Sequence, residues 1–119
     1  MPSPIDNMKP EDAPDWFWTL IERSEGDRER LRELATALSQ DELKQAFEYY
    51  RMLASYVMPE DLDEDPAFDL ANWIVAQGKD LYFGIYKGRT KTPQPTRSGR
   101  GLWSVLAEVY WDRFGKNLV

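Results

Sequence analysis

The stretch 39–57, SQDELKQAFEYYRMLASYV, carries the strongest fold signal in the chain. It opens with a capping box, in which Ser39 and Glu42 can each satisfy an unpaired backbone amide of the other. Apolar residues then recur at helical spacing, namely Leu43, Ala46, Phe47, Tyr50, Leu53, Ala54 and Val57. The pattern predicts a long helix that buries one face and ends before Pro59.

Two shorter helices are predicted before this one. Residues 1–11 contain three prolines and no periodic pattern, so we expect an extended lead-in. Asp12 is expected to cap the first helix, with Pro14 tolerated in its first turn and Gly26 ending it. Asp27 is expected to cap the second, whose apolar positions are Leu31, Leu34, Ala35 and Leu38.

Three more helices are predicted after the central one. Asp65 is expected to cap the first of them, with Pro66 at its first position and Phe68 on its inner face. Short apolar patterns predict the other two over 79–86 and 102–114. No stretch alternates apolar and polar residues over the length of a strand. The sequence therefore predicts one all-α domain over 12–119, a compact bundle of five to six helices.

Residues 87–101 differ from the rest of the chain. They hold five basic residues, three glycines, two prolines and no acid, whereas the rest holds 10 basic and 21 acidic residues. This composition is typical of a flexible basic loop. Its candidate phosphate contacts are Arg89, Lys91, Arg97 and Arg100.

The chain of 119 residues has no histidine and no cysteine. This excludes Ser-His and Cys-His catalysis, disulfides and the usual zinc ligands. Hydrophobic residues make up 42% of the chain, enough for a core, and the net charge is −6. An acidic protein is repelled by phosphate backbones and anionic membranes. With no signal-peptide pattern at the start, we expect a cytoplasmic protein that binds no membrane and needs no cofactor.

Two segments carry a family resemblance. They are Phe17-Trp18-x-Leu20-Ile21-Glu22 and Phe68-x-x-x-x-Trp73-Ile74-Val75-x-Gln77-Gly78-Lys79-x-x-Tyr82. Together they resemble a bacterial family labelled domain of unknown function four-two-four-zero, over about residues 15–86. The link between the third and fourth helices is shorter here than in that family, and the basic loop is not a feature of it. The resemblance implies a helical fold and a bacterial origin, but no reaction.

The acidic connector before the fourth helix has part of a calcium-loop pattern. Asp61, Asp63 and Asp65 match its opening spacing. The sixth position, however, is Pro66 instead of the glycine that the turn needs, and the twelfth is Asn72 instead of a bidentate Glu. We therefore expect no tight metal binding, and a connector that caps a helix or attracts a basic partner.

The aromatic residues exceed what one small core needs. Trp16 and Trp18 flank Phe17 on the first helix, so all three cannot share one narrow inward stripe. An exposed Trp is enriched at binding hot spots. Trp16 and Trp18, with Asp61, Asp63 and Asp65, are therefore the candidate partner-binding residues.

Three functions remain open on the sequence alone. The leading one is a small acidic interaction protein, not an enzyme, such as a toxin-neutralising immunity protein or a regulatory partner. The alternative is a nucleotide- or nucleic-acid-linked module that contacts phosphate through 87–101. A second alternative is an enzyme built on carboxylates such as Glu22, Glu48 or Glu108, although nothing in the sequence fixes a pair of them.

Overall fold

The computed structural model describes residues 8–60 and 62–117. Within them the chain forms a 3₁₀ turn, Pro10–Asp12, and six α-helices, with no β-strand. The helices are α1 (Asp15–Ser24), α2 (Arg28–Thr36), α3 (Gln40–Ser55), α4 (Glu64–Ala76), α5 (Lys79–Tyr86) and α6 (Leu102–Phe114). The predicted all-α bundle of five to six helices is confirmed.

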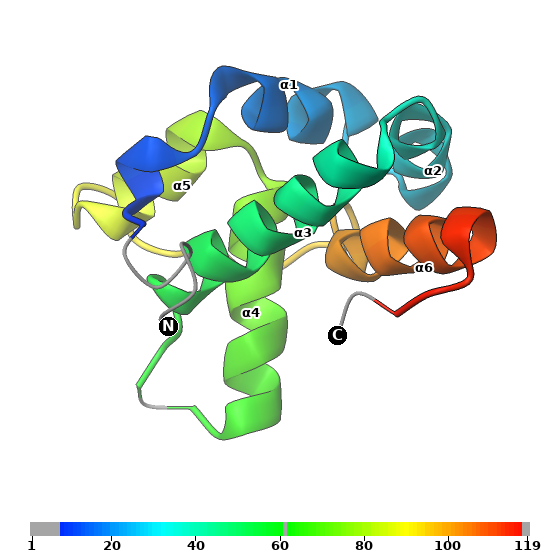
Figure 1. Ribbon diagram of the computed structural model, residues 1–119. Coiled ribbons are helices and arrows are strands. Elements are labelled where there is room, and N and C mark those ends of the chain that lie inside the picture. The colour runs from blue at the N-terminus through cyan, green and yellow to red at the C-terminus, as the bar shows by residue number, and fades with distance from the viewer. Residues whose placement is uncertain (1–7, 61, 118–119) are drawn as a thin grey trace, which may run out of the picture.

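Helix α3 lies at the centre of the arrangement (Figure 1). It contacts α4 and α6, while α2 packs against both α1 and α6. The first half of α4 extends to the bottom of the view in Figure 1, whereas α1 and α5 lie at the top. The two ends of α4 are therefore in different surroundings.

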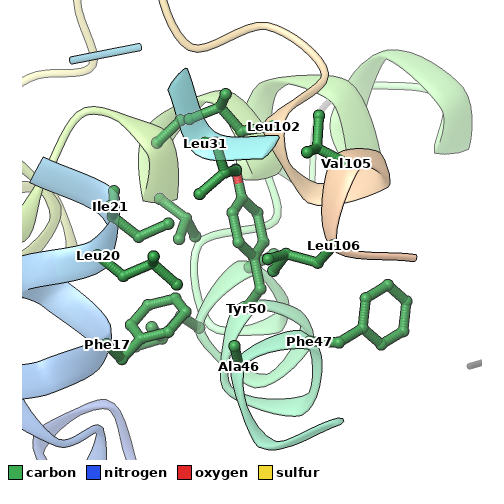
Figure 2. Packing of buried hydrophobic residues seen from close by; sticks show 14 of the residues in the cluster. Phe17, Leu20, Ile21, Leu31, Ala46, Phe47, Tyr50, Leu102, Val105 and Leu106 are labelled. Atoms are coloured by element: carbon green, nitrogen blue, oxygen red, sulfur yellow. The ribbon is translucent and has the colours of Figure 1, made fainter. Parts of the chain in front are cut away.

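The core is built around α3 by residues of α1, α2, α4, α5 and α6. The part shown in Figure 2 lies where α1, α2, α3 and α6 meet. Figure 2 shows Tyr50 of α3 between side chains of these helices, with Phe17, Leu31 and Leu106 around it. The Tyr50 hydroxyl donates to the backbone oxygen of Asn72 at 2.7 Å. The hydroxyl of the equally buried Tyr82 donates to the backbone oxygen of Leu53 at 2.6 Å. Each buried hydroxyl thus has an acceptor on another helix, which offsets the cost of burying it.

The predicted helix ends are confirmed at three places. Asp27 Oδ1 accepts from the backbone amide of Glu29 at 2.8 Å. Ser39 Oγ accepts from the Glu42 amide at 3.1 Å, and Glu42 Oε1 accepts from the Ser39 amide at 2.8 Å. After α6, Gly115 adopts a left-handed conformation and its amide bonds to the Trp111 oxygen. Helices α5 and α6 also span the predicted residues.

The prediction that Asp12 caps the first helix is wrong. Asp12 ends the 3₁₀ turn, where its carboxylate accepts from the Lys9 amide at 2.9 Å. Helix α1 begins three residues later, at Asp15, directly after Pro14. A residue that precedes a proline is pushed out of the helical region, and Ala13 is indeed extended, with ψ of 126°. Pro14 therefore separates Asp12 from the helix.

Three predictions about the first half of α4 are also wrong, namely Asp65 as the cap, Pro66 at the first position and Phe68 on the inner face. The N-cap is Asp63, not Asp65, and Pro66 lies within the first turn, where a missing amide is tolerated. Phe68 is 38% exposed instead of on the inner face. The buried face of α4 runs through Ala67, Ala71, Ile74 and Val75, so Phe68 falls to one side of it.

The basic loop is tied down at both ends. After α5, the amides of Arg89 and Thr90 both donate to the Gly84 oxygen, at 2.8 and 3.0 Å. Before α6, the Gly99 amide donates to the Gly26 oxygen at 2.9 Å. Residues 91–98 between these ties are exposed. Flexibility of this middle part stays a prediction.

Candidate functional site

The two candidate tryptophans have different surroundings. Trp16 is half-buried, with its ring edge-on to Tyr49 at 6.1 Å between centroids. Trp18 is 3% exposed because α5 covers it, with the rings of Tyr82 and Phe83 at 5.4 and 6.0 Å. Trp18 therefore belongs to the core and offers a partner almost no surface, which corrects the expectation that it is a binding anchor.

The acidic connector leads into an exposed helical face. Asp61 lies outside the described residues. Asp63 and Asp65 are both exposed, at the N-cap and in the first turn of α4. Among residues 8–60 and 62–117, no three Asp or Glu side chains come close enough together to hold a metal ion. The absence of tight metal binding stays a prediction.

Phe68 lies among these carboxylates. Glu64 and Asp65 precede it by four and three residues, so the three side chains share one face of the helix. Asp69 follows directly and is exposed as well. We call the set Asp63, Glu64, Asp65, Phe68 and Asp69 the acidic face of α4.

The ring of Phe68 is held in place. It meets Trp103 of α6 edge-on, with 5.2 Å between centroids and 85° between planes. Trp103 in turn packs on the buried Phe47 of α3, at 6.2 Å. Leu62, just before the helix, is 43% exposed and adds a second apolar side chain. The acidic face thus carries a fixed aromatic ring that is still open to solvent.

The charge around this face is of one sign. No Lys or Arg occurs from residue 52 to residue 78, whereas this segment holds six acidic residues. In the part of the chain that the structure describes, no carboxylate of the acidic face lies within ion-pairing distance of a cation. The negative charge is therefore not neutralised locally, and it extends into solvent.

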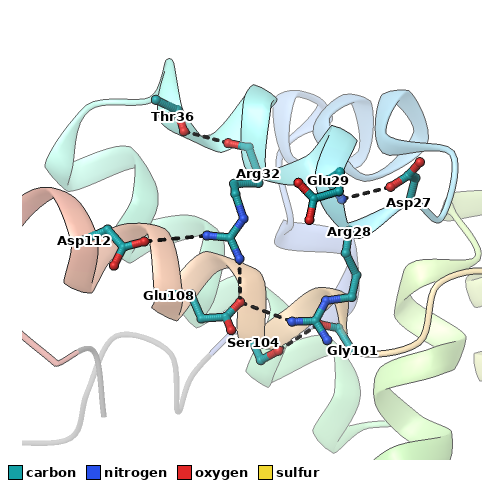
Figure 3. Close-up of polar contacts among 9 residues, drawn as sticks. All are labelled: Asp27, Arg28, Glu29, Arg32, Thr36, Gly101, Ser104, Glu108 and Asp112. Carbon is teal, nitrogen blue, oxygen red and sulfur yellow. Dashed lines mark hydrogen bonds and ion pairs between the residues drawn. The ribbon is translucent and has the colours of Figure 1, made fainter.

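Some carboxylates elsewhere are paired with arginines, as Figure 3 shows for α2 and α6. Glu108 Oε2 lies 3.2 Å from Arg28 Nη2 and 3.1 Å from Arg32 Nη2. Arg32 Nη1 also lies 3.6 Å from Asp112 Oδ2. This cluster joins two helices and leaves Glu108 acting as an ion-pair partner.

The other candidate catalytic carboxylates also have no shared site. Glu22 Oε2 accepts from the backbone amide of Lys79 at 3.1 Å, which caps the start of α5. Glu48 is exposed on α3. Glu22, Glu48 and Glu108 thus lie on three different helices, with two of them held in structural contacts.

The candidate phosphate contacts are split between two places. Arg89 lies just after α5, next to the tie to Gly84. Arg97 and Arg100 lie in the turn before α6, where Arg100 Nε donates to the Thr96 oxygen at 3.0 Å. Lys91 is exposed between them. Arg89 is therefore held at the end of α5, whereas Arg97 and Arg100 are held at the start of α6.

Phe68 and Leu62 are exposed apolar residues that were not expected at the surface from the sequence. One signal could have found Phe68, namely its place on the same helical face as Glu64 and Asp65. Trp111 was also missed; it is 52% exposed on α6. Helical spacing indicates this position, because Trp111 lies on the side of α6 opposite the buried Leu102, Val105, Leu106 and Val109.

Comparison with known proteins gives no relative. No protein family, no curated protein and no solved structure matches the chain. The resemblance to the bacterial family of unknown function stays a prediction. No helix among the described residues is long and apolar enough to cross a bilayer.

Proposed function

We propose that the protein acts by binding a basic protein partner through the acidic face of α4. The observation that carries this proposal is Phe68, an exposed aromatic ring surrounded by unpaired carboxylates. A toxin-neutralising immunity protein and a regulatory partner both work by such binding, and both fall within the proposal.

Two physical effects support it. Unneutralised charge of one sign steers an oppositely charged partner and raises the association rate. Aromatic side chains that are already held in one orientation lose little entropy on binding and serve as anchors. The acidic face of α4 supplies both, because Trp103 fixes the Phe68 ring while the carboxylates around it face solvent.

The test compares two triple variants with equal changes in net charge. The α4 variant carries Glu64→Lys, Asp65→Lys and Asp69→Lys. The control variant carries Glu29→Lys, Glu33→Lys and Glu48→Lys on α2 and α3, all of them exposed. The α4 variant loses two first-turn acids, Glu64 and Asp65, and the control variant loses one, Glu29, so each set also changes the electrostatics of a helix start.

Each immobilised protein is exposed to an extract of its native host, and retained proteins are quantified by mass spectrometry. We expect a basic protein that the wild type and the control variant retain and that the α4 variant loses. Phe68→Ala is expected to lose it too. The proposal is wrong if the α4 variant retains the same proteins as the wild type, or if no basic protein is retained at all.

The same preparations test phosphate contact by the basic loop. Submicromolar binding of a nucleic acid at physiological salt would favour that alternative, since nonspecific contact is typically about 1–100 μM. Neutralising Arg89, Lys91, Arg97 and Arg100 would then abolish it. We expect neither result.

A further inference from the structure

A second part of the surface is hollowed, away from the acidic face of α4. The hollow has a volume of about 410 Å³ and lies between the 3₁₀ turn, the start of α1 and α5. In Figure 1 these elements lie above the exposed first half of α4. Pockets for small molecules typically measure about 300–1,000 Å³, so this one is large enough for a small ligand.

The apolar wall of the hollow is aromatic. Its exposed part is the partly buried ring of Phe83, and the buried Trp18 supports that ring from behind, tilted by 58° at 6.0 Å.

The rim carries charges of both signs. Three carboxylates and three cations line the hollow, of which Lys79 and Asp15 form an ion pair at 3.5 Å. The remaining four are Glu11, Asp80, Lys87 and Arg89, and within residues 8–60 and 62–117 none of them has an ion-pair partner. A simple anion would be repelled by the two carboxylates, and a simple cation by Lys87 and Arg89.

We propose that this hollow binds a small zwitterion with an apolar body, of the chemical class of an apolar amino acid. The carboxylate of the ligand pairs with Lys87 and Arg89, and its ammonium group pairs with Glu11 and Asp80. Its apolar body lies against the partly exposed ring of Phe83, where an aromatic side chain gains most. This function is independent of partner binding by α4.

The test is calorimetric titration of the full chain with L-phenylalanine, L-tryptophan and L-leucine. Two analogues of L-phenylalanine serve as probes: 3-phenylpropanoate lacks the ammonium group, and 2-phenylethylamine lacks the carboxylate. We expect saturable binding of at least one amino acid. An analogue that carries only one of the two charges should bind about tenfold more weakly, because it loses one charge-assisted contact. Both single-charge analogues are analogues of L-phenylalanine, which is therefore the main probe.

A matched pair of variants links binding to the hollow. Lys87→Ala with Arg89→Ala removes two cations that line it, whereas Lys91→Ala with Arg97→Ala removes two exposed cations of the same loop that do not. We expect the first pair to weaken binding about tenfold and the second to leave it unchanged. Because all four side chains are exposed, circular dichroism should show both variants folded.

Three results would overturn the proposal. One is the absence of saturable binding for all three amino acids up to about 1 mM, the weak end of ligand affinity. Another is that 3-phenylpropanoate or 2-phenylethylamine binds as tightly as L-phenylalanine. The third is an equal loss of binding in the two double variants. That result would mean that the total positive charge of the loop affects binding, and not the two cations that line the hollow.

Discussion

Single residues at the helix ends decide where several helices begin. Asp27 and Ser39 cap α2 and α3 as their sequence contexts predict. Asp12 and Asp65 do not cap, and in both cases a proline lies within two residues. A cap can therefore be predicted where the local chain is free to fold around it. It is missed where a proline shifts the first helical residue.

The capping box at Ser39 is expected to stabilise the fold. Ser39→Ala removes the acceptor for the Glu42 amide, and we expect a loss of about 1 kcal/mol in the free energy of unfolding. Urea unfolding measures it. Ser55→Ala is the control, since Ser55 Oγ only donates to the Met52 oxygen within the last turn of α3. Equal losses in the two variants would contradict a capping role.

At the scale of elements, the end of the basic loop docks onto the bundle. Gly99 has a φ of +89° and is buried against Ala76 and Gln77 at the end of α4. Gln77 Nε2 also donates to the Ser98 oxygen at 3.0 Å. The composition of residues 87–101 predicts a loop, but it gives no signal that the loop's last turn packs on α4. That contact joins residues about twenty positions apart.

Gly99→Ala is expected to destabilise the protein. A Cβ there would lie 2.6 Å from Gln77 Nε2 and 2.9 Å from the Ala76 Cβ, in a backbone conformation unfavourable for alanine. We expect a loss of more than about 1 kcal/mol, measured by thermal or urea unfolding.

Gly88→Ala is the matched control. Gly88 also has a positive φ, of +73°, but a Cβ there would have nothing within 4 Å. The difference between the two variants therefore isolates the contact of the loop with α4. If Gly88→Ala costs as much as Gly99→Ala, the loop end is not docked in solution.

For the whole molecule, tyrosines inside the core couple stability to high pH. Burial raises the pKa of Tyr50 well above its ordinary value of 10.0. Above pH 10 the unfolded chain therefore loses the proton that the folded chain keeps. The unfolded state then binds fewer protons, so the free energy of unfolding falls as pH rises.

Tyr50→Phe tests this coupling. It removes one titrating group, and we expect the slope of unfolding free energy between pH 10 and 12 to become less steep by about 1.4 kcal/mol per pH unit. The substitution also leaves the Asn72 oxygen without its donor. That loss of stability is the same at every pH, so it lowers the whole curve of unfolding free energy against pH without changing its slope. An unchanged slope would mean that Tyr50 ionises equally in both states.

The fold class and most helices could be predicted from the sequence, because periodicity and caps are local. The exposed surface could be predicted only in part. Trp16 and Trp18 were both candidates for exposure, but Trp18 lies under α5, whereas Phe68 was expected inside and lies at the surface. Which side of a helix faces inward depends on its neighbours, and only packing of α5 on α1 and of α6 on α4 decides these two rings.

The most direct test of binding by the acidic face of α4 is the association rate constant with the captured partner, measured over a series of salt concentrations. For the wild type and the control variant, the rate constant should fall as salt rises. For the α4 variant it should be about tenfold lower at low salt and depend little on salt. The opposite result, an α4 variant that associates at the wild-type rate with the same salt dependence, would contradict partner recognition by this face.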